Sequence, residues 1–265
     1  MLSSQNFRSL VSKYEKLEYP SSLGNELVNL LLTELPAGFI QGLAEKYPLY
    51  PGVRGVNKYI HEYDFYILQS IKRAVLLKLH QRDRLNILDI GSGVGWFAFI
   101  CTKLGHTCIG LDEDSEALYT ETFSLLGFER YIHRIMPFQP LPNFREKFDL
   151  VTCFQICFNL YTLDNYDWGP GEWAYFIYDL VNQFGPTMDL FIGFNFHESD
   201  LHNGKFYSPL VKHWLENHGF ILLPGGKVYF SPHDKQVPFK DWLDEWHASN
   251  TASLCSGKNS REAKG

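Results

Sequence analysis

Residues 87–95 are the part of the chain whose residue types and spacing are best suited to bind a ligand. They read Ile-Leu-Asp-Ile-Gly-Ser-Gly-Val-Gly, an apolar run with one acid, Asp89, followed by a turn that contains Gly91, Gly93 and Gly95. Because glycine has no Cβ atom, such a turn can bend sharply and let a ligand approach its backbone. A carboxylate at the place of Asp89 suits a cationic ligand group better than a phosphate, since like charges repel. The segment predicts a strand, a turn and a helix that bind a nucleotide-type cofactor.

A dinucleotide site is the competing interpretation of this turn. Its fingerprint is Gly-x-Gly-x-x-Gly, but counting from Gly91 places Trp96 at the sixth position. The third glycine, Gly95, comes one position early. An NAD(P)-dependent oxidoreductase is therefore the weaker alternative.

The elements that must position the turn alternate between strands and helices. Hydrophobic periodicity predicts a helix over 57–80 before the turn, and helices over 115–126, 173–184 and 206–218 after it. Strands are predicted over 86–90, 106–111, 129–135, 147–154 and 188–194, and a hairpin over 219–223 and 227–230. Such a series predicts a mostly parallel sheet with an antiparallel strand at or near its edge.

Three regions are expected along the chain. Residues 1–56 read as two or three short helices separated by prolines, a helical N-terminal extension or lid. Residues 57–231 form the predicted core domain. Residues 232–265 form a C-terminal segment whose tail, from about residue 249, is rich in Ser, Lys and Gly and is expected to be disordered.

With these elements in place, the sequence resembles the class I S-adenosylmethionine-dependent methyltransferases over residues 57–231. The resemblance rests on residues 87–95, on Gly-Leu-Asp at 110–112 and on Phe-Asp-Leu-Val at 148–151. It implies a Rossmann-like, doubly wound, mostly parallel seven-stranded sheet with a terminal antiparallel hairpin. It also implies that S-adenosylmethionine is the cofactor and that the chain is a methyltransferase.

The resemblance also implies roles for single residues. Asp89 would face the ammonium group of the cofactor, and Asp112 would accept hydrogen bonds from both ribose hydroxyls, which a carboxylate can do at once. The implied cofactor-binding residues are Asp89, Gly91, Ser92, Gly93, Gly95, Asp112, Glu113, Phe138, Gln155 and Ile156. Where the family often has an acid for the adenine amine, this chain reads Arg-Ile-Met-Pro-Phe at 134–138, so backbone groups near Phe138 and apolar contact would hold adenine instead.

Methyl transfer from a sulfonium is an in-line displacement, in which the protein mainly positions the reacting groups. A general base can assist, and His197, shortly after the predicted strand 188–194, is the first candidate, although a polar loop histidine is more often an exposed residue or a cap. Candidate substrate-binding residues follow the predicted strands or precede the first one: Tyr59, Tyr63, Asn159, Trp168 and Asn195. The aromatic helix 173–184 is better explained as core.

The amino-acid composition limits the classes of partner that we expect this chain to bind. The chain has 265 residues and a net charge of -6. This negative charge argues against electrostatic binding of nucleic acid or of an anionic membrane over a large surface. Five cysteines without a second pair at ligand spacing predict buried free thiols in a reducing compartment and no metal site. A cytoplasmic enzyme with a small-molecule acceptor, methylated on O, N or C, is expected. The alternative from another class is a non-catalytic S-adenosylmethionine-binding regulatory or partner protein.

Overall fold

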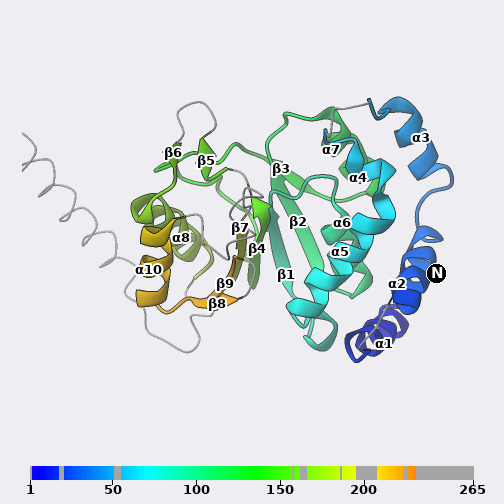
Figure 1. The fold of residues 1–265 in the computed structure, drawn as a ribbon, viewed down its shortest axis with the longest axis horizontal. Coiled ribbons are helices and arrows are strands. Elements are labelled where there is room, and N and C mark those ends of the chain that lie inside the picture. Colours follow the sequence, from blue (N-terminus) through cyan, green and yellow to red (C-terminus); the bar gives the residue numbers. More distant parts are fainter. Residues whose placement is uncertain are drawn as a thin grey trace, which may run out of the picture. The chain divides into compact units, whose positions relative to one another are not determined.

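The computed structural model describes residues 2–17, 21–50, 55–156, 158–161, 166–185, 187–194, 208–223 and 226–230. Its contacts divide the chain into two compact units (Figure 1). The first unit is Met1–Arg134 with Phe148–Phe154, and the second is Ile135–Lys147 with Gln155–Gly265. The domain bounds expected from the sequence, at residues 56 and 231, stay predictions.

Seven strands follow the order β3-β2-β1-β4-β7-β9-β8. The pairs β1–β2, β1–β4 and β2–β3 are parallel, whereas β7–β9 and β8–β9 are antiparallel. The Rossmann-like, mostly parallel seven-stranded sheet with a terminal antiparallel hairpin is therefore confirmed.

The first unit contains the parallel part of the sheet. Its strands are β1 (Asn86–Ile90), β2 (Thr107–Asp112), β3 (Arg130–Ile132) and the first five residues of β4 (Leu150–Ile156). Helices α6 (Trp96–Lys103) and α7 (Ala117–Leu126) connect successive strands. All residues of β1 except the first are buried, as expected for a parallel strand that is covered on both faces.

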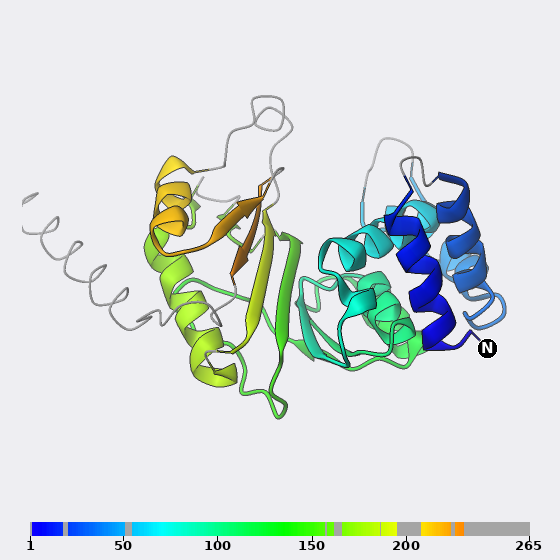
Figure 2. The same ribbon diagram turned by 90° about the horizontal axis from the view of Figure 1, so that it is seen from below.

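Short helices precede this sheet in the same unit. They are α1 (Ser4–Glu15), α2 (Ser21–Leu32), α3 (Phe39–Lys46), α4 (Lys58–His61), α5 (Tyr63–Leu76) and the 3-10 turn η1 (Leu79–Gln81). Figure 2 shows α1 and α2 side by side. Arg8 of α1 holds the extension to the core, because its guanidinium donates hydrogen bonds of 2.6 Å to the carbonyl oxygens of Leu104 and Arg82. The described residues before the sheet are thus mostly helical, whereas their role as a separate extension or lid stays a prediction.

The second unit contains α8 (Pro170–Phe184), β7 (Asp189–Phe194), α10 (Pro209–Asn217), β8 (Ile221–Leu223) and β9 (Lys227–Phe230). Helices α8 and α10 lie on one side of its strands (Figure 2). At the start of α8, Pro170 occupies the first turn and the Glu172 carboxylate accepts a 3.0 Å hydrogen bond from the Gly169 N–H. A small hairpin, β5 (Leu160–Tyr161) with β6 (Tyr166–Asp167), precedes this helix.

Several predicted boundaries were wrong. The helix predicted over 57–80 is broken at Glu62, whose φ of -109° and ψ of 34° are not helical. The strand predicted over 129–135 ends at Ile132, because it pairs only with the last three residues of β2, and His133 therefore lies just beyond it. The hairpin of β5 and β6 was not predicted, since its two-residue strands are too short for a periodic pattern.

Gly110, in the middle of β2, is held in contact with the turn and with α7. A Cβ atom at this position would lie 2.6 Å from Ser92 Oγ and 2.7 Å from ring carbons of Phe123. We expect Gly110→Ala to lower the free energy of unfolding by about 1–3 kcal/mol through overpacking. The control is Gly42→Ala in α3, where no atom lies within 4 Å of an added Cβ and helix propensity should add about 0.5–1 kcal/mol. Urea unfolding measures both, and equal effects would contradict the close packing.

Candidate functional site

The glycine turn extends the contact between β1 and β2 beyond the end of β1. The Gly91 N–H donates to the Leu111 carbonyl oxygen at 2.8 Å, and the Gly95 N–H donates to the Ser92 carbonyl oxygen at 3.0 Å. Gly91, Gly93 and Gly95 all have positive φ, and a Cβ atom on Gly95 would lie 2.8 Å from the Phe123 ring. The turn therefore requires glycine both for its backbone conformation and for its packing.

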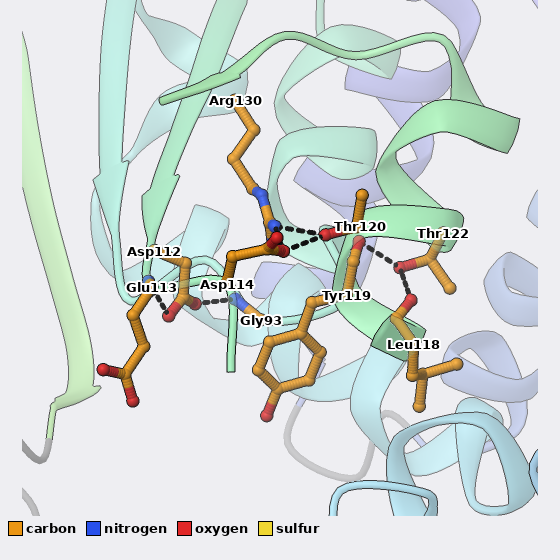
Figure 3. Close-up of polar contacts among 9 residues, drawn as sticks. All are labelled: Gly93, Asp112, Glu113, Asp114, Leu118, Tyr119, Thr120, Thr122 and Arg130. Carbon is orange, nitrogen blue, oxygen red and sulfur yellow. Dashed lines mark hydrogen bonds and ion pairs between the residues drawn. The ribbon is translucent and has the colours of Figure 1, made fainter. Parts of the chain in front are cut away.

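Asp112, the last residue of β2, is bonded to this turn. Its Oδ2 accepts the Gly93 N–H at 2.7 Å, and its Oδ1 accepts the Glu113 N–H at 2.9 Å (Figure 3). Burial raises the pKa of the Asp112 carboxyl, whereas these two hydrogen bonds act in the opposite sense. Two carboxylate oxygens offer about four acceptor positions, so this side chain can still accept two hydroxyl donors.

Arg130, Asp114 and Thr120 form a polar group, called the clamp below, that orders the segment after Asp112. The Nη2 of Arg130 in β3 donates to Thr120 Oγ1 at 2.6 Å and lies 3.0 Å from Asp114 Oδ1 (Figure 3). The Arg130 side chain is only 5 % exposed, and its charge favours ionised Asp112. No local pattern indicated this role, because an arginine at the start of an edge strand is typical of a solvent-exposed charge.

The pKa of Asp89, in the first unit, is strongly raised. It is buried, and its Oδ1 accepts a 2.8 Å hydrogen bond from Thr152 Oγ1 of the neighbouring strand β4. Burial raises the pKa of Asp89 to about 7, while the hydrogen bond from Thr152 and the positive charge of Arg73 favour its ionised form. A cation brought to this carboxylate would compensate the cost of burying it.

Arg73 of α5 is the nearby cation, and it was not predicted from the sequence. Its guanidinium lies 4.6 Å from the centre of the Phe154 ring, within the range of a cation–π contact. Burial lowers the pKa of Arg73, and the charge of Asp89 raises it. Its position beside the apolar residues Ile71 and Ala74 of the predicted helix was the only available signal.

Three tyrosines gather near the turn. The Tyr59 ring lies 4.5 Å from the Tyr66 ring and 6.3 Å from the Tyr119 ring, measured between centres. A Cβ atom on Gly93 would lie 3.9 Å from Tyr119 Cζ, so this ring stands beside the turn. Of the two tyrosines predicted before β1, the structure brings Tyr59 into this group, whereas the ring contacts described for the group do not include Tyr63.

Phe138, Gln155 and Ile156, the remaining predicted cofactor residues, belong to the second unit. Phe138 has φ of 56° and Gln155 has φ of 52°, values that non-glycine residues seldom adopt. Such strain persists only where the surrounding structure enforces it, and it gathers at functional sites. The Phe138 ring packs against Tyr175 of α8, and Ile156 is buried.

Two of the predicted substrate residues in the second unit, Asn159 and Trp168, are buried. The Trp168 N–H donates a 2.9 Å hydrogen bond to the Asn159 carbonyl oxygen, so the two residues lie side by side. Trp168 packs against Trp173 of the aromatic helix, in agreement with a core role for that helix. Asn195 and the candidate base His197 lie outside the described residues, so their roles stay predictions.

The described residues were also searched for metal-binding groups, free cysteines and membrane-spanning helices. Among them, no group of three or more His, Cys, Asp or Glu side chains is placed to hold a metal ion. Cys101, Cys108 and Cys153 are buried free thiols, as predicted for them. Within the same part of the chain, no helix has the length and apolar character that crossing a membrane requires.

Comparison with known proteins gave results from solved structures only. No protein-family model matches the chain, and no curated protein matches it. A Pyrococcus horikoshii protein is 14% identical over 70% of this chain and 96% of its own, with a TM-score of 0.44. A putative S-adenosylmethionine-dependent methyltransferase from Methanococcus maripaludis is 12% identical over 69% of this chain and 96% of its own, with a TM-score of 0.41.

A third similar structure is an S-adenosylmethionine-bound amino pentose methyltransferase from Micromonospora echinaspora. It is 18% identical over 53% of this chain and 58% of its own, with a TM-score of 0.36. Other similar structures are also described as S-adenosylmethionine-dependent methyltransferases. These likenesses are too distant to carry an argument about function. The fold assignment rests on the strand order and register.

The hydrogen bond from Thr152 to Asp89 predicts a pH-dependent contribution to stability. The folded-state pKa of Asp89, about 7, lies above the ordinary value of 3.8, so ionising Asp89 destabilises the fold as pH rises from about 4 to 7. Thr152→Val removes the donor and should raise this pKa further. We expect a loss of roughly 1–3 kcal/mol above pH 7 and a smaller loss at pH 5, where Asp89 is protonated.

Thr122→Val in α7 is the matched control. Thr122 is equally buried, but its hydroxyl donates to the Leu118 and Tyr119 carbonyl oxygens instead of to a carboxylate (Figure 3). Its loss of stability, measured by urea unfolding at pH 5 and pH 8, should be the same at both values. A Thr152→Val effect that is equally independent of pH would contradict the assigned pKa of Asp89.

Proposed function

We propose that this chain, whose fold is that of class I S-adenosylmethionine-dependent methyltransferases, binds S-adenosylmethionine and transfers its methyl group to a small-molecule acceptor. One observation carries the proposal. Asp112, at the carboxyl end of β2, is hydrogen-bonded to Gly93 of the turn that follows β1, and Asp89 lies buried at the base of that turn. Two carboxylates around one glycine turn suit a ligand with hydroxyl donors and a cation.

The residues fit the cofactor group by group. The ribose offers two hydroxyl donors, and Asp112 has acceptor positions left for them. The amino-acid part offers an ammonium group, which would offset the burial of Asp89. A pyrophosphate at the same turn would instead meet the carboxylate of Asp89, and this repulsion disfavours a dinucleotide.

When bound, S-adenosylmethionine supplies an electrophilic methyl group on a sulfonium. The task of this chain is to fix its position, because an in-line displacement depends on the alignment of the reacting atoms. Asp112 is already oriented by two backbone N–H groups, and the clamp of Arg130 with Asp114 and Thr120 orders the segment beyond it. For an acceptor that must lose a proton, His197 remains the proposed base.

Calorimetry on the full chain tests the cofactor. We expect S-adenosylmethionine and its demethylated product to bind and NAD not to bind. Asp112→Asn removes a charge-assisted acceptor, so it should weaken S-adenosylmethionine binding by about tenfold to a hundredfold. The control Asp83→Asn changes an exposed carboxylate and should leave the affinity unchanged. Binding of NAD in place of S-adenosylmethionine would refute the proposal.

Transfer itself requires a second measurement. Labelled S-adenosylmethionine incubated with the chain and a metabolite extract should yield a small product that carries the labelled methyl group. Binding of the cofactor without any such product would favour the non-catalytic binding protein instead.

The pKa of Asp89 makes cofactor affinity depend on pH. Below about pH 7 the carboxyl is protonated in the free protein and must lose its proton to face an ammonium group. We expect the affinity to rise up to about tenfold per pH unit between pH 5 and pH 7 and then to level off. Calorimetry should show weaker and nearly pH-independent binding for Asp89→Asn, whereas Asp112→Asn should keep most of the pH dependence. A flat profile for the unmodified chain would exclude this role of Asp89.

A further inference from the structure

Tyr119 of α7 lies beside the glycine turn, within the first unit. A Cβ atom on Gly93 would lie 3.9 Å from Cζ and 4.0 Å from Cε1 of the Tyr119 ring. Gly93 has no Cβ atom, so no side chain of the turn fills the space in front of this ring edge. Both residues are only half-buried, and the Gly93 N–H is bonded to Asp112 on the other side (Figure 3). The ring and the Asp112 carboxylate therefore border the same residue of the turn.

The tyrosine rings near the turn are suited to attract a cation. The face of an aromatic ring carries partial negative charge and attracts a cation within about 6 Å of the ring centre. One ring of the group already makes this contact, because Lys58 Nζ lies 5.1 Å from the centre of the Tyr59 ring. The Tyr119 ring lies 6.3 Å from the Tyr59 ring, on the side of the turn. Tyr119 is therefore placed to make the same kind of contact with a ligand.

The covalent structure of S-adenosylmethionine indicates which of its groups would come near this ring. Its sulfur joins the ribose to the amino-acid part. In the proposed function the ribose hydroxyls bind to Asp112 and the ammonium group faces Asp89, which are the acids on either side of the turn. The sulfonium, being between these two parts of the molecule, then lies along the turn. Gly93 belongs to this part of the turn, and Tyr119 stands beside it.

From this arrangement we infer that the Tyr119 ring recognises the positive charge of the sulfonium, and that it makes the site select S-adenosylmethionine over its demethylated product, S-adenosylhomocysteine. The inference rests on the proposed function. The product keeps the ribose hydroxyls and the ammonium group, so Asp112 and Asp89 cannot distinguish the two molecules. Its sulfur is neutral, so the attraction to an aromatic ring is lost. Methyl transfer thus removes the contact with Tyr119 and favours release of the product.

Calorimetry on the full chain with three ligands tests this role. S-adenosylmethionine carries a sulfonium, sinefungin carries an ammonium group in its place, and S-adenosylhomocysteine is neutral there. Tyr119→Leu removes the ring, so it should weaken binding of the two charged ligands by about threefold to tenfold. It should leave the affinity for S-adenosylhomocysteine unchanged. The matched control is Tyr119→Phe, which keeps the ring without the hydroxyl and should keep most of the preference for the charged ligands.

A second variant changes the electron density of the ring and keeps its shape. Replacement of Tyr119 by 3,4,5-trifluorophenylalanine withdraws electron density from the ring face, which weakens its attraction for a cation. Compared with Tyr119→Phe, this variant should bind S-adenosylmethionine and sinefungin more weakly and S-adenosylhomocysteine equally well. The melting temperature of each variant shows whether it is folded. If Tyr119→Leu does not fold, the comparison of the two ring variants decides the outcome.

Other outcomes separate this inference from the proposed function. Equal weakening of all three ligands in Tyr119→Leu would show a packing role for the ring and overturn the inference. A Tyr119→Phe variant that loses the preference for charged ligands would assign recognition to the hydroxyl and overturn it as well. Unchanged affinities in every variant refute the role of Tyr119 and leave the proposed function intact. If the unmodified chain binds none of the three ligands, the proposed function is refuted and the inference with it.

Discussion

The parallel ladder between β1 and β2 is the constraint on which the candidate site depends. It aligns Asp89 with Gly110 and Ile90 with Leu111, and the Gly91 N–H continues it by bonding to the Leu111 carbonyl oxygen. The turn therefore begins beside the end of β2, where the Asp112 carboxylate reaches the Gly93 N–H. A shift of one residue in this register would turn Asp112 toward the other face of the sheet.

The same ladder gives its two acids different electrostatic surroundings. Asp89 lies inside the sheet, where burial outweighs the hydrogen bond from Thr152 and raises its pKa to about 7. Asp112 lies at the strand end, where backbone N–H groups hold its oxygens and Arg130 adds a favourable charge. The Asp89 carboxylate is thus suited to bind a cation and the Asp112 carboxylate to accept hydrogen bonds from neutral donors, although the two residues belong to neighbouring strands.

Much of the fold could be predicted from periodicity. The strands β1 and β2, the aromatic helix α8 and the final strand β9 lie close to their predicted bounds, because each contains an uninterrupted apolar pattern. The pattern failed where structure depends on one residue or one partner strand, as at the break at Glu62 and at the short edge strand β3. It also missed Arg73 and Arg130, since a charged residue beside an apolar face does not reveal its partner.

The sequence by itself determined the alternation of strands and helices, the glycine turn and the two acids near it, because glycine content, periodicity and residue type are local properties. Only the tertiary structure decided that Asp112 bonds to Gly93, that Thr152 donates to Asp89 and that the Asn159 amide is buried with no hydrogen-bond partner among the described residues. These three features depend on which strands become neighbours and on which polar groups burial removes from water. Hydrogen bonds and the cost of desolvation act between residues that are far apart in the chain, so no local pattern can encode them.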